Sequence, residues 1–114
     1  MQPAPALSLT LNEAYSELHD DLNSAYWAAS TLAAKDQIKG VLEIVADVIT
    51  TIDATDLSTR NAAYASLGTE VASVNKQLKT LQKQINGLIS DIKTATAVVS
   101  GITQAISIAA KMFP

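Results

Sequence analysis

The sequence predicts an all-α protein, and three observations support this fold class. The prolines are Pro3, Pro5 and Pro114, so residues 6–113 contain no residue that forbids helix continuation. Aromatic residues make up only 4% of the chain, while Ala, Leu, Gln and Lys recur throughout, which favours helix over strand. Apolar residues also recur every three or four positions. With 114 residues, 48% of them hydrophobic and 17% charged, we expect one folded domain over residues 10–114.

The first half of the chain predicts an extended leader and two helical segments. Residues 1–9 are expected to be extended, because the residue before each proline avoids the α region. Thr10 is a candidate N-cap with Glu13 at the capping-box position. A first apolar stripe follows: Leu11, Tyr15, Leu18, Leu22, Ala25, Ala29 and Leu32. A second stripe is out of phase with it, which predicts a kink or turn near residues 33–36: Ile38, Val41, Leu42, Val45, Val48, Ile49 and Ile52.

The second half carries the most regular pattern. Residues 53–59 are rich in cap and turn formers, and Asp56 or Ser58 is placed to cap the next helix. Beyond them the apolar positions alternate strictly by three and four, which is the pattern of a coiled-coil seam. They are Tyr64, Leu67, Val71, Val74, Leu78, Leu81, Ile85, Leu88, Ile92, Ala95, Val99, Ile102, Ile106, Ala109 and Phe113.

Two architectures fit this pattern. The unbroken heptad phase favours one helix over residues 57–112, about 84 Å long at 1.5 Å per residue, folded back on the first half as a long hairpin with a coiled-coil seam. The alternative is a compact up-down four-helix bundle, with a break at Asn86 and Gly87 and with Ser90 capping a fourth helix. Leu78, Leu81 and Ile85 are predicted to be buried residues of the seam.

Charge is distributed unequally along the chain. Residues 1–56 hold nine acidic residues against Lys35 and Lys39, a net charge of −7. Residues 57–114 hold six basic residues against Glu70 and Asp91, a net charge of +4. This complementarity favours packing of the first half against the second, within one chain or between copies. A pI of about 4.9 argues against nucleic-acid binding.

The residue types predict neither an enzyme nor a cofactor or metal site. The chain has no cysteine and one histidine, so neither a Cys-His nor a Ser-His nucleophile is indicated. A dense acidic cluster exists in the first helix, and it consists of Glu13, Glu17, His19, Asp20 and Asp21. Its spacing does not match a di-iron helix, because Ser16 stands three residues before the histidine where a glutamate is required. We interpret the cluster as a solvated face.

Three features predict binding. Lys76, Lys79 and Lys83 share one helix face and form a possible site for an anionic partner. Trp27 lies beside its stripe, as either a core-edge residue or an interface anchor. Residues 94–110 carry no charge and would span about 25 Å of a hydrocarbon core about 30 Å thick. This segment supports an alternative function as a membrane-active or pore-forming helical protein.

The function expected from these features is a non-enzymatic helical protein-interaction module, such as an adaptor, an inhibitor or a small chaperone. In the hairpin, residues 101–113 would face the leader and lack a helical partner, which predicts a homo-oligomer with Ile102, Ile106 and Phe113 in its interface. Residues 1–11 contain no Sec signal peptide, so a cytoplasmic location is the default expectation, with secretion by a signal-independent route left open.

Overall fold

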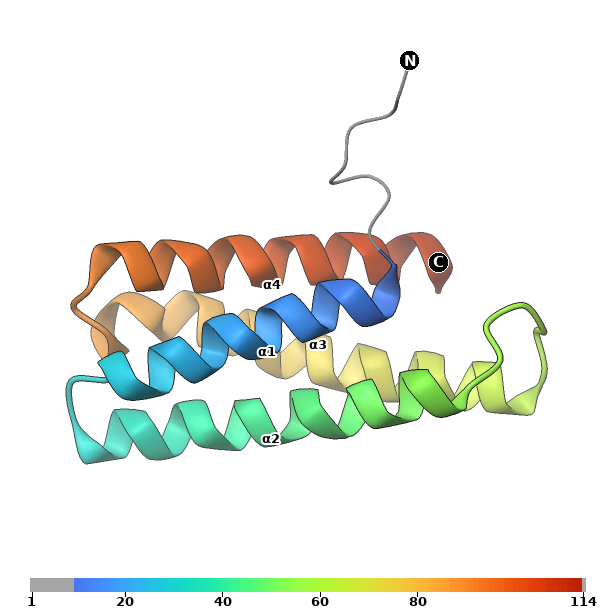
Figure 1. Ribbon diagram of the computed structural model, residues 1–114, viewed down its shortest axis with the longest axis horizontal. Helices are drawn as coiled ribbons and strands as arrows, with labels where there is room; N and C mark the ends of the chain where they lie inside the picture. The colour runs from blue at the N-terminus through green and yellow to red at the C-terminus, as the bar shows by residue number, and fades with distance from the viewer. Residues whose placement is uncertain (1–9, 114) are drawn as a thin grey trace, which may run out of the picture.

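The computed structural model describes residues 10–113 as an up-down-up-down bundle of four α-helices (Figure 1). They are α1 (Leu11–Ala28), α2 (Leu32–Ala54), α3 (Ala62–Leu88) and α4 (Ile92–Met112). Helix α1 packs against α2 and α4, and α3 also packs against α2 and α4, so α1 and α3 are diagonal to each other. The predicted all-α class is confirmed. The predicted leader, residues 1–9, lies outside the described residues.

The predicted long hairpin is wrong, because the second half of the chain is two helices. Helix α3 ends at Leu88, and the next residue, Ile89, is extended with φ −130° and ψ 134°. The turn between α1 and α2 stabilises this end: the backbone N–H of Ser30 donates to the carbonyl of Leu88 at 2.9 Å, and Ala29 pairs with Ile89 in a single antiparallel bridge. A free helical carbonyl is thereby satisfied from another part of the bundle. The four-helix alternative is correct.

Local capping explains where the helices begin. The predicted capping box of α1 is confirmed, since Thr10 Oγ1 accepts from the backbone N–H of Glu13 at 3.1 Å and Glu13 Oε1 accepts from that of Thr10 at 2.9 Å. Helix α2 is capped by Thr31, slightly before the predicted turn at 33–36. The predicted caps of the last two helices are wrong: Asn61 caps α3, and Asp91 caps α4.

The residues first expected to cap α3 shape the preceding loop instead. Asp56 accepts hydrogen bonds from the side chain and backbone N–H of Ser58 and from the hydroxyl of Thr59. These bonds, those from Ser58 foremost, hold the pKa of the exposed Asp56 carboxyl below its usual range. Hydrogen bonds within the loop therefore stabilise its turn, and Asn61 then caps the start of α3.

The core confirms the predicted stripe in α3 and corrects it in α4. Leu78, Leu81 and Ile85 are buried as predicted. In α4, Ile92 is 81% exposed, and the buried residues follow a partly shifted stripe: Ala95, Val98, Ile102, Ala105 and Ala109. Ala95, Ile102 and Ala109 are buried as predicted, whereas Val98 and Ala105 are buried where the strict seam has Val99 and Ile106, because α4 packs against α1 as well as α3.

Candidate binding groove between α3 and α4

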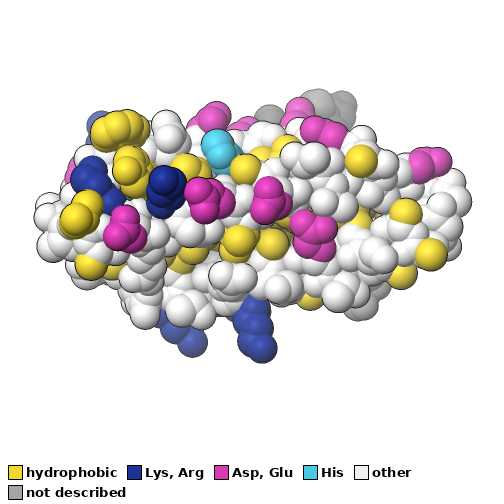
Figure 2. All heavy atoms as spheres, turned by 90° about the horizontal axis from the view of Figure 1, so that it is seen from below, with side chains coloured by type: hydrophobic (Ala, Val, Ile, Leu, Met, Phe, Trp, Pro, Cys, Tyr) yellow, Lys and Arg dark blue, Asp and Glu magenta, His cyan; other side chains and the backbone are white. Residues whose placement is uncertain are grey.

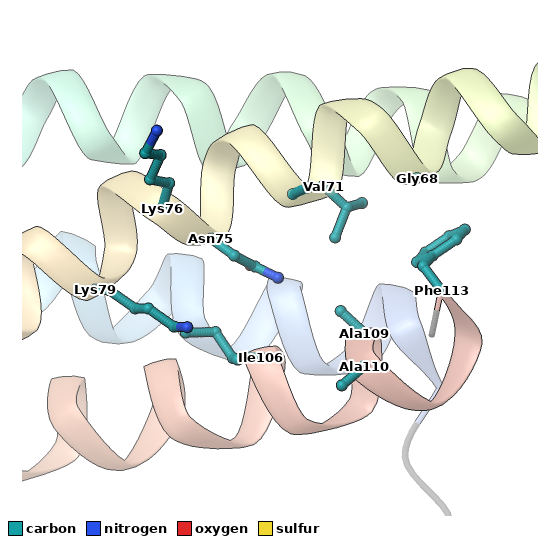
Figure 3. A pocket seen from close by; sticks show the side chains of 10 residues that line it. Gly68, Val71, Asn75, Lys76, Lys79, Ile106, Ala109, Ala110 and Phe113 are labelled. Carbon is teal, nitrogen blue, oxygen red and sulfur yellow. The ribbon is translucent and has the colours of Figure 1, made fainter.

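An open groove of about 390 Å³ lies between α3 and the C-terminal half of α4 (Figure 3). We call it the α3–α4 groove. Its lining residues are Gly68, Val71, Ala72, Asn75, Lys76, Lys79, Ile106, Ala109, Ala110 and Phe113. Most are apolar, two carry positive charge, and no acidic side chain occurs among them. The groove therefore combines an apolar lining with cationic side chains from one helix.

Small residues create the groove and larger ones bound it. Gly68 and Ala72 of α3 leave little side-chain volume to fill the space facing α4. At one end the ring of Phe113 packs over Gly68, so closely that a Cβ on this glycine would lie 2.9 Å from Phe113 Cδ1. Beyond the other end, Gln82 Nε2 donates to the Val99 carbonyl at 3.0 Å and to Thr103 Oγ1 at 2.9 Å. The hollow is thus a defined stretch of the α3–α4 interface.

The Phe113 end is fixed by further contacts. The hydroxyl of Tyr64 donates to the carbonyl of Met112 at 2.7 Å, and the rings of Tyr64 and Phe113 lie 5.0 Å apart between centroids. The guanidinium of Arg60 lies 4.7 Å from the centroid of the Tyr64 ring. These contacts anchor the last turn of α4 against the first turn of α3.

A buried hydrogen bond orients the polar residue of the groove. Tyr15 of α1 is fully buried, and its hydroxyl donates to Asn75 Oδ1 at 2.5 Å. Burial raises the pKa of Tyr15 to about 12, and the weaker opposing effect of the Asn75 hydrogen bond does not reverse it, so the phenol remains a neutral donor at physiological pH. With its oxygen held by Tyr15, Asn75 turns its amide nitrogen toward the groove (Figure 3). The amide N–H₂ is available to a ligand's acceptor.

The predicted lysine face is divided by the structure. Lys76 and Lys79 line the groove, and the Lys79 side chain extends beside Ile106 (Figure 3). Lys83 is exposed one turn further along α3 and is not part of the lining. The sequence signal for the groove itself was the pair Gly68 and Ala72 at i and i+4, which acquires meaning only once α4 lies opposite.

The predicted interface residues occupy three different environments. Ile102 is fully buried in the core, so it is not available to a second chain, and its placement in an interface is wrong. Ile106 and Phe113 are half-buried and line the groove. Trp27 is 72% exposed at the far end of α1, which excludes a core-edge position. The bundle supplies the partners that the hairpin lacked for residues 101–113, and self-association stays a prediction.

The acidic cluster lies on α1, the helix diagonal to α3. Among residues 10–113, no group of three or more His, Cys, Asp or Glu side chains could hold a metal ion. Burial, followed by the charges of Asp20 and Glu17, raises the pKa of Asp21 above its ordinary value. Ser16, His19 and Asp20 line a separate hollow of about 340 Å³ with Ala46 and Ile49 of α2. Seen from the α2 side, acidic side chains spread along the molecule (Figure 2).

Helix α4 is the element that carries the uncharged segment 94–110. By length and composition it is apolar enough to cross a membrane, with a mean hydropathy of 1.2, and among the described residues it is the one helix that meets this criterion. In the bundle it contributes Val98, Ile102 and Ala105 to the core. Of its apolar window, 28% is buried inside the bundle.

No family model, curated protein or solved structure matches this chain. The features of the bundle that bear on its function are the groove, the charges and the exposed hydrophobic surfaces.

Proposed function

We propose that this chain is a non-enzymatic protein-binding module whose α3–α4 groove receives an amphipathic segment of a partner, with apolar side chains facing the groove and acidic side chains facing its lysines. The observation that supports this most directly is the lining: small and apolar residues of both helices, with Lys76 and Lys79 on the α3 side. A helix that lays its apolar face into a hydrophobic groove is a recurring mode of peptide recognition.

Each part of the lining contributes a different component of recognition. Burial of the apolar surface of Ala72, Ile106 and Phe113 against a partner removes it from water, which favours binding. Lys76 and Lys79 attract acidic partners and disfavour basic ones, which increases the association rate and the specificity more than the affinity. The Asn75 amide adds a donor for a backbone carbonyl or a carboxylate.

An adaptor, an inhibitor and a small chaperone would all use such a groove, and a second copy of the chain is one acidic partner. The two halves of the chain carry net charges of −7 and +4, and they form the α1–α2 and α3–α4 sides of the bundle. The α1–α2 side of one copy would therefore be attracted to the α3–α4 side of another. Self-association that weakens as salt is added is the expected sign of this arrangement.

Two synthetic helical peptides test the groove. Both carry leucines on one face, and the other face carries glutamates in one peptide and lysines in the other. We expect the glutamate peptide to bind the folded chain more tightly, and Ala72→Glu to weaken that binding by roughly tenfold or more, since a carboxylate would then stand in the groove. Fluorescence anisotropy of the labelled peptides measures both effects.

The matched control is Ala65→Glu, which adds the same charge to an exposed position of α3 outside the lining. It should weaken binding much less than Ala72→Glu. Equal binding of the two peptides, or equal effects of the two variants, would contradict the proposed site.

A second candidate function is membrane activity of α4, favoured by its uncharged segment and its hydropathy. Insertion would require α4 to leave the bundle and to remove Ile102 and Ala105 from the core. A dye-leakage assay with liposomes separates the candidates: the binding module causes no leakage, whereas leakage by the wild-type chain supports membrane activity.

A further inference from the structure

One end of the bundle exposes large hydrophobic side chains. This end, which we call the turn end, carries the α1–α2 and α3–α4 turns (Figure 1). Trp27, Leu32 and Ile92 are 72%, 75% and 81% exposed there, and they are the large hydrophobic residues of 10–113 that are exposed to this degree. They come from the last turn of α1, the start of α2 and the start of α4. The Ala29–Ile89 bridge joins the two turns that carry them.

The aromatic part of the turn end is ordered by its neighbours. The rings of Tyr26 and Trp27 meet edge to face, with centroids 5.1 Å apart. Lys35 Nζ lies 4.9 Å from the Tyr26 centroid and 5.3 Å from the Trp27 centroid, and it donates to the carbonyl of Tyr26 at 3.0 Å. The indole is therefore held against the helix while most of its surface remains in water.

Charge differs between the two ends of the bundle. The two helical turns nearest the turn end, with their connecting segments, carry Lys35, Lys39, Lys83 and Lys93 against Asp21, Asp36 and Asp91. The corresponding region at the opposite end carries Glu13, Glu17, Asp47, Asp53 and Asp56 against Arg60 and Lys111. The net charge is +1 at the turn end and −3 at the other end. Figure 2 shows the gathered hydrophobic side chains at one end of the molecule, with basic side chains beside them.

We propose that the turn end docks the folded bundle on a phospholipid surface, with Trp27, Leu32 and Ile92 entering the interfacial layer. Trp and Tyr favour this layer because they have an apolar ring and a polar group, and neighbouring lysines favour anionic headgroups. The charge difference orients the chain, because the acidic end is repelled by the same headgroups. A chain that is acidic overall would then approach the surface by this end alone.

The size of the exposed surface favours a lipid over a second protein. Even at the ~250 Å² that the largest aromatic side chains bury, three side chains fall short of the roughly 800 Å² that each partner contributes to a standard protein interface. Insertion into a lipid interface needs no complementary surface, because each side chain that enters contributes separately. The α3–α4 groove lies along the side of the bundle, so docking leaves it open to a partner.

The single tryptophan of the chain is at the proposed contact and reports on it directly. The full chain is mixed with vesicles of phosphatidylcholine, either alone or combined with phosphatidylserine. We expect the Trp27 emission to shift to shorter wavelength, more strongly with phosphatidylserine, and the chain to float with the vesicles. Leu32→Asp with Ile92→Asp should abolish both effects while the indole is retained. These positions are exposed, so circular dichroism should show an unchanged helical content.

The control Ala63→Asp places one carboxylate on an exposed position of α3 near the opposite end and should leave both effects intact. Three outcomes would overturn the proposal. In the first, the wild-type chain remains unbound at both lipid compositions. In the second, its Trp27 emission shifts with protein concentration in the absence of lipid, which would identify a second copy as the occupant. In the third, the free chain already emits as a buried indole. Docking without dye leakage also separates this mode from insertion of α4, and neither result depends on peptide binding in the groove.

Discussion

Helices α3 and α4 lie side by side but contact α1 in different ways. Helix α3 is diagonal to α1 and reaches it across the bundle through the hydrogen bond between Tyr15 and Asn75. Helix α4 is adjacent to α1 and approaches it closely at Gly101, where a Cβ would lie 2.9 Å from Asp21 Oδ2 and 3.8 Å from the Cα of Leu18. The α1–α3 contact is thus a hydrogen bond between two side chains, whereas at the α1–α4 contact the backbone of Gly101 lies directly against side chains of α1.

The buried faces of the two helices differ accordingly. Helix α3 contributes mainly large side chains, which are Tyr64, Leu67, Val71, Val74, Leu78, Leu81 and Ile85. Helix α4 contributes Ala95, Ala105 and Ala109 together with Val98 and Ile102. A helix that fills the space between diagonal neighbours needs volume, whereas a helix that packs at short distance needs small residues. Helix α3 thus fills the core with large side chains, whereas α4 allows close helix packing, although their sequence pattern is continuous.

The largest loss of stability is expected from truncating a buried side chain of α3. Leu81→Ala removes a side chain that is 1% exposed and should lower the free energy of unfolding by roughly 2 to 5 kcal/mol, because it leaves a cavity in addition to the lost apolar burial. In α4, Ile92 belongs to the same predicted stripe but is 81% exposed, so Ile92→Ala should change stability by less than about 0.5 kcal/mol. Denaturant unfolding of both variants measures the difference. Comparable losses would mean that the stripe continues unbroken into α4 and that the turn at residues 89–91 is misplaced.

Features encoded in a few neighbouring residues could be predicted from the sequence. The start of α1 follows from Thr10 and Glu13, which satisfy each other's backbone N–H groups with no help from the rest of the bundle. The buried face of α3 follows from the spacing of its apolar residues, since a helix presents one face to the core. Both predictions depend on contacts within one helix.

Features that need two distant segments could not be predicted. The heptad phase continues through Leu88 and Ile92, and the α3 terminus is stabilised by Ser30, which is 58 positions away in sequence. For the same reason only part of the groove could be predicted. The sequence indicates the lysines on one helix face, but not that small residues of α3 and α4 lie opposite each other and leave space between the helices. At the turn end, the sequence indicates Trp27 as a possible anchor, but its periodicity places Leu32 and Ile92 in buried stripes, and both are exposed in the structure.

The diagonal contact predicts a loss of stability in alkali. Tyr15 has a pKa of about 12 in the folded chain against an ordinary value of 10.0, so between these values the unfolded chain loses a proton that the folded chain keeps. The unfolded state is therefore favoured as pH rises, and the wild-type chain should lose roughly 2 to 3 kcal/mol across this window through this group. Other tyrosines and lysines titrate there as well, so the measurement is a difference.

The comparison is with Tyr15→Phe, which keeps the buried ring and removes the titrating hydroxyl. At neutral pH the variant should lose about 1 kcal/mol for the hydrogen bond to Asn75. Above pH 10 its stability should fall less steeply than that of the wild-type chain, and the two curves should cross before pH 12, because the loss through Tyr15 exceeds the contribution of its hydrogen bond. Parallel curves from pH 10 to 12 would show that Tyr15 titrates normally and that the diagonal contact is open to water.

The smallest effect concerns the close approach of α4 to α1, and two glycines in the same bundle provide its test. Alanine in place of glycine within a helix normally stabilises by roughly 0.5 to 1 kcal/mol. A methyl group at Gly87 in α3 would meet no neighbouring side chain or helix within 4 Å, so Gly87→Ala should show this gain, reduced by its position in the last turn. At Gly101 the new methyl would meet the Asp21 carboxylate, which can move, and Leu18 Cδ1 at 3.3 Å, which is packed in the core. Because Leu18 must shift, Gly101→Ala should lose about 1 kcal/mol in place of the gain.

Thermal unfolding of the two variants gives opposite shifts in Tm if the α1–α4 distance is fixed by this glycine. Equal stabilisation by both would instead mean that α1 yields freely to the methyl group, and that α4 is held no closer to its neighbour than α3 is.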